Sequence, residues 1–127
     1  MIQDLDDLFT HSLNILHESE NLGVSGEGRM MGQEADLGLL LICTEDEVFV
    51  YDVKMLGVDA FKNGLGSVLG DEKILKILHD IRFISRCLYH QFGVRINNFY
   101  DTMIADQVFC TQMVFGGTEI DFEILGG

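Results

Sequence analysis

Two histidines are the first side chains in this sequence that could do chemistry. His79 and His90 could each act as a general base, but the sequence offers neither a nucleophile nor an orienting partner for them. They also lie too loosely around Cys87 for the closely spaced ligands of a zinc site. A role in the core or at an interface is therefore favoured for both histidines.

Carboxylates are the second group of candidates, because hard divalent cations bind oxygen ligands. Asp80 and Asp101 each precede a predicted helix, where aspartate commonly caps the free backbone N–H groups. Asp36 begins a predicted strand beside Glu34, so each of these three aspartates has a local structural explanation. The sequence has no glycine-rich loop with a lysine to hold a phosphate, so nucleotide hydrolysis is not predicted.

The charges are strongly acidic and unevenly distributed. There are 21 acidic and 8 basic residues, and the resulting net charge of −13 repels a phosphate backbone at long range. We interpret the acidic surface as one that favours solubility, with a docking surface for a basic partner as the alternative. One short segment is basic, and any RNA contact is expected there: its cations are Lys73, Lys76, Arg82, Arg86 and Arg95.

Length and composition predict one globular domain. The chain has 127 residues, of which 47% are hydrophobic and 23% are charged, so wholesale disorder is excluded. No apolar run approaches a membrane span, and the first residues do not resemble a signal peptide. The three cysteines Cys43, Cys87 and Cys110 are far apart in apolar stretches, which indicates reduced thiols and a cytoplasmic or nuclear protein.

The first half of the sequence predicts a helix followed by strands. Apolar residues at helical spacing predict an amphipathic helix over 2–17, and its interface candidates are Leu5, Phe9, Leu13 and Leu16. We favour the alternative to such an interface, in which this helix packs on its own sheet. A short strand over 22–25 is followed by a glycine loop from Gly26, where backbones could approach closely. Residues 37–43 and 48–51 predict an antiparallel pair joined by a polar hairpin.

The second half alternates helices and strands. A helical stripe is expected from Phe61 to a terminating Gly70, then a strand over 74–78 and a helix from Asp80 to Gly93. A strand over 96–100 leads into a last helix, whose inward residues are Ile104, Ala105, Val108 and Phe109. This order predicts an α/β fold with a mixed sheet, in which a three-strand meander precedes βαβα units and helices cover both faces.

Three stretches of residues make the pattern more specific. They are Ser25-Gly26-Glu27 on the first strand, His79-Asp80-Ile81-Arg82 after a later strand, and Asn98-Phe99-Tyr100-Asp101-Thr102 about twenty residues further on. Together they resemble the DEDD-type 3′-5′ exonuclease domain of the RNase H-like fold, from about Val24 to Gly117. We therefore predict three parts: an amphipathic helix over 1–20, an exonuclease-like domain over 21–117 and an acidic tail over 118–127.

The resemblance also implies which residues should hold metal. Active members use four carboxylates to bind two divalent metals that activate water and stabilise the phosphate. The first aspartate of the family's Asp-x-Glu pair is Ser25 here, and only Glu27 matches. The position of the second aspartate, five residues after His79, is Ile84, and the sequence ends at Gly127 before the helix that carries the last one. The resemblance thus predicts a degenerate, C-terminally shortened exonuclease without metal or other cofactor.

Three functions remain open on this reasoning. The favoured one is an adaptor, because the resemblance extends to a branch associated with the piRNA pathway of animal germ cells. That branch implies a homodimer or another protein partner in an RNA-silencing assembly, in the cytoplasm, a perinuclear germ granule or the nucleus. The second is weak, inert binding of single-stranded RNA through the segment Lys73–Arg95. The third is an active metal-dependent 3′-5′ exonuclease. No membrane association is expected.

Overall fold

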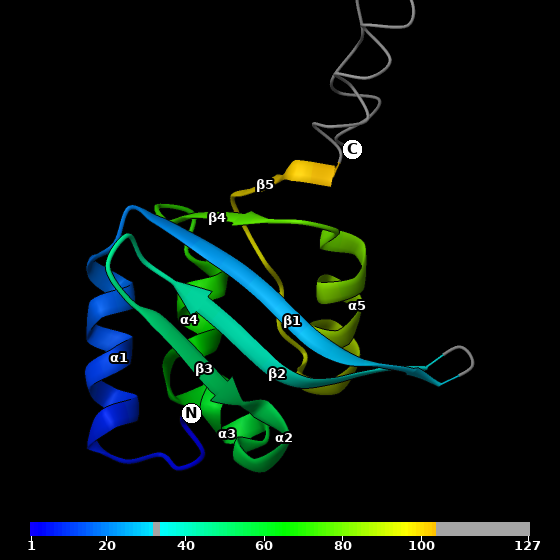
Figure 1. The fold of residues 1–127 in the computed structure, drawn as a ribbon, viewed down its shortest axis with the longest axis horizontal. Helices are drawn as coiled ribbons and strands as arrows, with labels where there is room; N and C mark the ends of the chain where they lie inside the picture. The colour runs from blue at the N-terminus through cyan, green and yellow to red at the C-terminus, as the bar shows by residue number, and fades with distance from the viewer. Residues whose placement is uncertain (32–33, 104–127) are drawn as a thin grey trace, which may run out of the picture.

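Strands and helices alternate as the sequence predicts, although several boundaries differ. The computed structural model describes residues 1–31 and 34–103 (Figure 1). Its elements are α1 (Asp7–Glu18), β1 (Asn21–Met31), β2 (Glu34–Cys43), β3 (Val48–Asp52), α2 (Val53–Leu56), α3 (Val58–Ala60), the π-helical turn η1 (Phe61–Leu65), α4 (Gly66–Gly70), β4 (Leu75–Leu78), α5 (Ile81–Phe92) and β5 (Phe99–Asp101).

The strands form one mixed sheet in the order β3-β2-β1-β4-β5. Strands β1, β2 and β3 are an antiparallel meander, and β4 and β5 continue the sheet in parallel with β1. In the hairpin between β2 and β3, the Thr44 hydroxyl accepts hydrogen bonds from the backbone N–H groups of Asp46 and Glu47. The predicted meander followed by βαβ units is confirmed.

The glycine loop predicted after Ser25 is wrong, because β1 continues to Met31. The backbone irregularity lies between Glu27 and Gly28, where the pairing with β2 shifts register. A Cβ atom on Gly28 would overlap the backbone of Asp36, so only glycine fits there. The glycines thus permit the predicted close approach of backbones, but they do so within a hairpin.

Helix α1 begins at Asp7, five residues later than predicted. The side chain of Asp6 accepts a hydrogen bond from the Phe9 N–H at 3.1 Å and so caps the first turn. Ile2 is not helical: its N–H donates to Val50 O at 2.7 Å, and its carbonyl accepts from the Asp52 N–H at 2.9 Å. The N-terminal residues therefore extend the sheet beside β3 before the chain turns into α1.

The segment between β3 and β4 is more broken than the single helical stripe predicted for it. Gly64 has φ 142°, a conformation that side chains strongly disfavour, and a Cβ there would lie 2.5 Å from Leu13 Cδ1. Gly70 is the last residue of α4, not the residue after it. The apolar residues of the stripe are nonetheless buried as predicted: Phe61, Leu65, Val68 and Leu69.

Helix α5 begins and ends next to residues in the left-handed conformation. Asp80, with φ 65°, precedes it and Gly93, with φ 69°, follows it. Gly93 ends the helix as predicted, but the Asp80 side chain makes no capping hydrogen bond, so that part of the prediction is wrong. The predicted strand over 96–100 is shorter and begins at Phe99. The last predicted helix, with Ile104, Ala105, Val108 and Phe109, falls outside the described residues.

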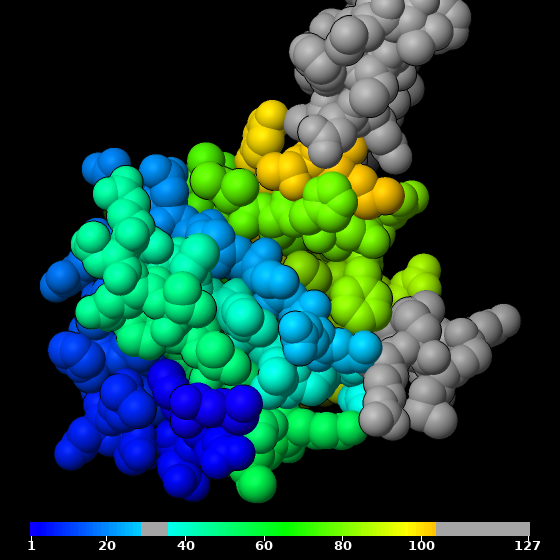
Figure 2. Space-filling view, viewed as in Figure 1, coloured from blue at the N-terminus to red at the C-terminus, as the bar shows by residue number. Residues whose placement is uncertain are grey.

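The described helices lie on one face of the sheet (Figure 1). That face carries the core, whose strand residues include Leu22, Val24, Leu40, Ile42 and Tyr51. On the opposite face, atoms of β1, β2 and β3 lie at the surface (Figure 2). The sequence predicted helices on both faces of the sheet, and the described helices cover one of them. Among these helices, none has both the length and the apolar character needed to cross a membrane.

Candidate functional site on the open sheet face

Successive side chains of a strand project from opposite faces of the sheet, so the residues expected at the exonuclease site lie on different sides of β1. Ser25 and Glu27 are exposed and project from the open face of β1. Ile84, on α5, is only 3% exposed and packs on the other side of the strand, where a methyl group at Gly26 would lie 3.6 Å from Ile84 Cγ1. The structure therefore places all three positions around one short stretch of β1, with Ile84 in the core.

These residues do not fit a two-metal centre. Such a centre needs several carboxylates converging on the same point, whereas Ser25 has a neutral hydroxyl and Ile84 an alkyl side chain. Within residues 1–31 and 34–103, no group of three His, Cys, Asp or Glu side chains comes together in a metal-binding arrangement.

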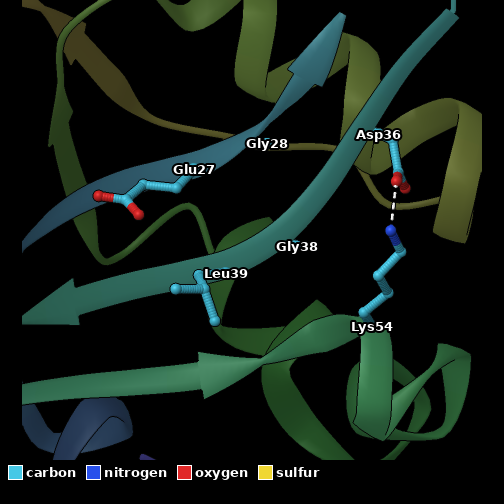
Figure 3. A pocket seen from close by; sticks show the side chains of 6 residues that line it. All are labelled: Glu27, Gly28, Asp36, Gly38, Leu39 and Lys54. Carbon is cyan, nitrogen blue, oxygen red and sulfur yellow. Dashed lines mark ion pairs between the residues drawn. The ribbon is translucent and has the colours of Figure 1, made fainter. Parts of the chain in front are cut away.

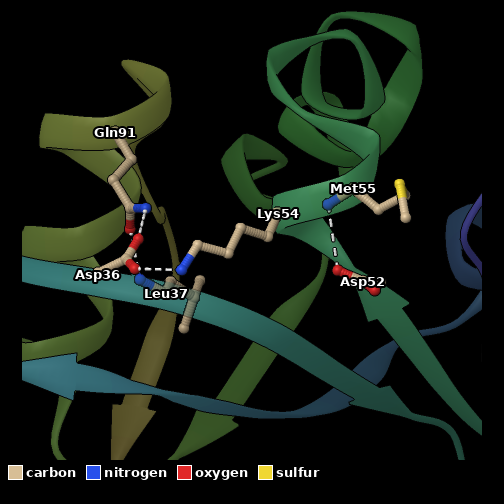
Figure 4. Close-up of polar contacts among 6 residues, drawn as sticks. All are labelled: Asp36, Leu37, Asp52, Lys54, Met55 and Gln91. Atoms are coloured by element: carbon tan, nitrogen blue, oxygen red, sulfur yellow. Dashed lines mark hydrogen bonds and ion pairs between the residues drawn. The ribbon is translucent and has the colours of Figure 1, made fainter.

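Glu27 borders a charged hollow of about 540 Å³ (Figure 3). Its lining residues are Glu27, Gly28, Asp36, Gly38, Leu39 and Lys54. Asp36 offers a second carboxylate, but its Oδ2 lies 2.7 Å from Lys54 Nζ and its Oδ1 accepts from Gln91 Nε2 at 2.8 Å (Figure 4). The Asp36 carboxylate is thus already neutralised within the chain.

Lys54 and Gln91 were not identified from the sequence. Gln91 Oε1 also accepts from the Leu37 N–H at 2.6 Å, so this side chain joins α5 to β2. Asp36, Lys54 and Gln91 come from three elements far apart in the sequence, and no local motif marks them. Only the pairing of β2 with β3 and the packing of α5 bring them together.

Ser25 lines a different, apolar hollow of about 370 Å³ on the same open face. We call it the Gly23 hollow; its lining residues are Gly23, Val24, Ser25, Leu41, Cys43, Val48, Ile77, Leu78, His79 and Thr102. Sequence analysis did not predict this hollow. It lies over the central strand at Gly23, whose register neighbours are Cys43 on β2 and Ile77 on β4.

The predicted basic segment does not form one continuous cationic surface. Lys76 has 0% exposure, and its Nζ donates to Ile74 O at 2.7 Å and Asp71 O at 2.5 Å. Burial lowers the pKa of Lys76, while the charge of Asp71 raises it. Lys76 is therefore a structural residue that cannot contact a phosphate in this conformation.

The other predicted cations are exposed, and the arginines gather around α5. Arg82 and Arg86 are one helical turn apart, and Arg82 Nε lies 3.9 Å from Asp80 Oδ1. The guanidinium of Arg95 lies over the ring of Tyr89, 5.4 Å from its centroid. Lys73 precedes β4 in a separate loop. His90 is also exposed and lies at the edge of the Tyr89 ring.

Three of the four interface candidates on the N-terminal helix are in the core. Phe9, Leu13 and Leu16 are buried, and Phe9 packs edge-on against Tyr51 with ring centroids 6.1 Å apart. Leu5 is exposed, but it precedes the helix. The helix therefore packs on its own sheet, and its buried face is not available to a partner.

Asp101 provides the cap that was expected from Asp80. Its carboxylate accepts hydrogen bonds from the N–H groups of Asp80, Ile81 and Met103 at 2.9 to 3.0 Å. Burial by itself would raise the pKa of Asp101, but these N–H groups and the nearby His79 lower it overall. Asp101 thus joins β5 to the start of α5 and also accepts a hydrogen bond from the Met103 N–H, while the last helix that it was predicted to cap lies outside the described residues.

Comparison with known proteins identifies the family. A family model described as 3′-5′ exonuclease matches residues 4–117. The piRNA biogenesis protein EXD1 of Homo sapiens is 43% identical over 94 residues, and that of Mus musculus is 42% identical over 85 residues. These matches cover 72% and 67% of this chain but 18% and 15% of the relatives, so the chain corresponds to a small part of them.

Solved structures show the same fold. The crystal structure of Trypanosoma brucei RNase D matches with a TM-score of 0.76 at 20% identity, covering 95% of this chain and 48% of that one. The catalytic core of RRP6 from Trypanosoma brucei matches with a TM-score of 0.74 at 24% identity, covering 84% and 29%. The RNase H-like fold expected from the sequence is confirmed, and the chain belongs to the 3′-5′ exonuclease family.

Proposed function

We propose that this chain is an exonuclease-like domain that does not cleave RNA and acts as a protein-binding adaptor in a piRNA-type RNA-silencing assembly. The observation that carries the proposal is the residue set around β1. The resemblance assigns Ser25 and Ile84 to positions where active members of the family carry carboxylates, and Ile84 is packed in the core. An alkyl side chain has no oxygen atom that could bind a hard divalent cation. Because Ile84 is packed in the core, a small rearrangement does not bring another side chain into its place.

The adaptor part of the proposal is supported by two features. The relatives from Homo sapiens and Mus musculus described above are named for piRNA biogenesis, and the open sheet face presents apolar side chains that no described helix covers. Exposed apolar surface on a folded domain commonly marks a contact with another molecule. Such a partner could be a second copy of this chain or a different protein.

The test of the inactive part is a nuclease assay with labelled single-stranded RNA and Mg²⁺ or Mn²⁺. We expect no shortening of the RNA by the parent chain. A matched Glu27→Gln variant controls for contaminating nucleases, since a contaminant is unaffected by this change. Metal-dependent shortening by the parent that disappears in Glu27→Gln would refute the proposal.

The test of the adaptor part is the solution mass measured by light scattering over a range of concentration and salt. A dimer or a defined complex that persists at high salt supports contact through apolar surface, because salt screens charge interactions but not apolar burial. Mass gained only with RNA and only at low salt would instead favour the RNA-binding alternative described below.

A second function, inert binding of RNA, is favoured by the arrangement around α5. Arg82, Arg86 and Arg95 are exposed, and Tyr89 adds an aromatic surface next to the Arg95 guanidinium. With so few cations on a chain of net charge −13, such binding should weaken steeply as salt increases. The variant Arg82→Gln with Arg86→Gln should abolish it, whereas Lys62→Gln, an exposed cation on η1, should leave it unchanged.

A further inference from the structure

The open face has a row of side chains that crosses all five strands. The register pairs Val48 with Cys43, Cys43 with Gly23, Gly23 with Ile77, and Ile77 with Tyr100. Paired residues project from the same face of a sheet, so these five positions form one continuous line. Every side chain in it is apolar, aromatic or a thiol, although Val48 is 64% exposed, Tyr100 53% and Ile77 38%.

The middle of this row is the Gly23 hollow. A Cβ on Gly23 would lie 2.5 Å from Cys43 Sγ, so the Cys43 thiol lies over the glycine, and both residues line the depression together with Val48 and Ile77. Its volume of about 370 Å³ can take one or two large apolar side chains. Ser25 lies at its edge, in the position where active exonucleases carry a charged aspartate. The neutral residue at this position removes a charge that would oppose apolar binding.

A carboxylate lies next to the hollow along β1. Glu27 follows Ser25 by two residues on the same face, a spacing of about 7 Å in a strand. The Glu27 side chain is exposed, and among the described residues it has no ion-pair or hydrogen-bond partner. Figure 3 shows it directed away from the Asp36–Lys54 pair. The open face therefore combines an apolar depression with the exposed carboxylate of Glu27.

We propose that this face binds an extended, basic segment of a protein partner. One apolar or aromatic side chain enters the Gly23 hollow, and an arginine or lysine two residues away pairs with Glu27. Alternate residues of an extended peptide are also about 7 Å apart, so the two side chains match the spacing of Ser25 and Glu27. The net charge of −13 attracts a basic partner at long range. This inference rests on the proposed adaptor role and names the chemistry of the partner.

The experiment uses fluorescence anisotropy with the full chain and three labelled synthetic peptides. The first peptide has a phenylalanine flanked two residues away on each side by arginine, within glycine and serine. In the second, glutamate replaces arginine, and in the third, serine replaces phenylalanine. We expect saturable binding of the first peptide and at least about tenfold weaker binding of the other two, because each lacks one of the two contacts.

Matched variants of the protein locate the binding surface. Ile77→Lys, on the open face, should weaken binding about tenfold or more, and Glu27→Gln should weaken it several-fold and reduce its salt dependence. Leu8→Lys, which changes an exposed leucine on α1, should bind like the parent. Equal binding by Ile77→Lys and the parent would overturn the inference.

Alkylation of Cys43 distinguishes other occupants of the hollow. If the peptide occupies the hollow, it should slow the reaction of the Cys43 thiol with N-ethylmaleimide, as measured by peptide mapping. If Cys43 is already protected in the full chain alone, another part of the chain or a second copy covers the hollow, and the inference is wrong. If the peptide does not bind but the parent chain lacks nuclease activity, this inference fails and the proposed function still stands. Nuclease activity of the parent chain would refute the proposed function itself.

Discussion

The two faces of one sheet differ in what their residues do. On the helix-covered face, Leu22, Leu40, Ile42 and Tyr51 are at most 1% exposed and form the core. On the open face, their neighbours along the same strands are partly or largely exposed, although many are equally apolar. The position that the resemblance assigns to the first aspartate of the family's Asp-x-Glu pair is on this face, as Ser25. The contrast indicates that burial on the helix-covered face holds the fold together, whereas the open face leaves apolar side chains exposed to contact with other molecules.

The largest expected effect separates two adjacent leucines. Leu40→Ala should reduce the free energy of unfolding by about 2–5 kcal/mol, because Leu40 is fully buried and its removal leaves a cavity. Leu41→Ala should cost about 1 kcal/mol or less, because Leu41 faces the open side and is partly exposed already. Urea denaturation of both variants measures the difference. Equal losses of unfolding free energy in the two variants would show that the open face is covered, and would contradict the difference between the two faces.

The next effect concerns Asp101, which joins β5 to α5. Asp101→Asn should lower the free energy of unfolding by about 1–3 kcal/mol at neutral pH, since the amide cannot accept all three hydrogen bonds equally well. The pKa of Asp101 is lowered in the folded state, so its charge stabilises the fold above the ordinary aspartate pKa of about 4. This stabilisation is lost as the pH falls through the folded-state pKa.

Measuring thermal or urea unfolding from pH 7 to pH 2 checks the sign of this effect. The difference between the parent and Asp101→Asn should shrink as the pH falls below about 4. Asp80→Asn is the matched control, because the Asp80 side chain caps no helix, and it should have a smaller effect at pH 7. A larger loss in Asp80→Asn than in Asp101→Asn would contradict the assignment of the cap.

A smaller effect concerns a hydroxyl in the core. The Tyr51 hydroxyl donates to Ser12 Oγ at 2.8 Å, and burial raises the pKa of Tyr51 to about 12 although this hydrogen bond to Ser12 acts to lower it. Tyr51→Phe should cost about 1 kcal/mol below pH 10, because it removes this hydrogen bond and leaves the packed ring in place.

The alkaline limb of the stability curve tests the same residue. A pKa raised in the folded state means that the neutral phenol stabilises the fold fully below pH 10 and progressively less as the pH rises through about 12. The parent should therefore lose more stability than Tyr51→Phe between pH 10 and 12. Parallel curves for the two proteins over this range would show that the Tyr51 hydroxyl is not buried.

The smallest expected effect is at the charged hollow. Lys54→Gln removes the ion pair with Asp36, but the Lys54 side chain is 66% exposed, so the loss should be about 1 kcal/mol or less. The loss should become smaller still in high salt, which screens exposed ion pairs. A loss of stability comparable with that of Leu40→Ala would mean that this hollow belongs to the folding core and would weaken the contrast between the two faces.

Local patterns in the sequence were sufficient for much of the fold. The alternation of apolar residues, the polar hairpin after Cys43 and the helix-ending Gly93 all predicted elements that the structure contains. The three motif stretches also led to the correct family. These features depend on contacts between residues close in the chain, and for this reason they could be recognised without the tertiary structure.

The errors concern residues whose partners are distant in the chain. Lys76 was expected at a basic surface, but β4 is covered by the loop after α4, and the lysine is buried there. Asp80 was expected to cap α5, but the carboxylate of Asp101, 21 residues later, occupies that role. Gly28 was placed in a loop because the sequence does not show how closely the backbone of Asp36 approaches it.

The sequence by itself determined the residue types at the positions that the resemblance assigns to the exonuclease site, Ser25 and Ile84. It also determined the net charge and the order of most elements. Only the tertiary structure decided which apolar residues are buried and which line the Gly23 hollow, because both faces of the strands are rich in apolar residues. The packing of helices against one face, and the register across five strands, distinguish the two sets.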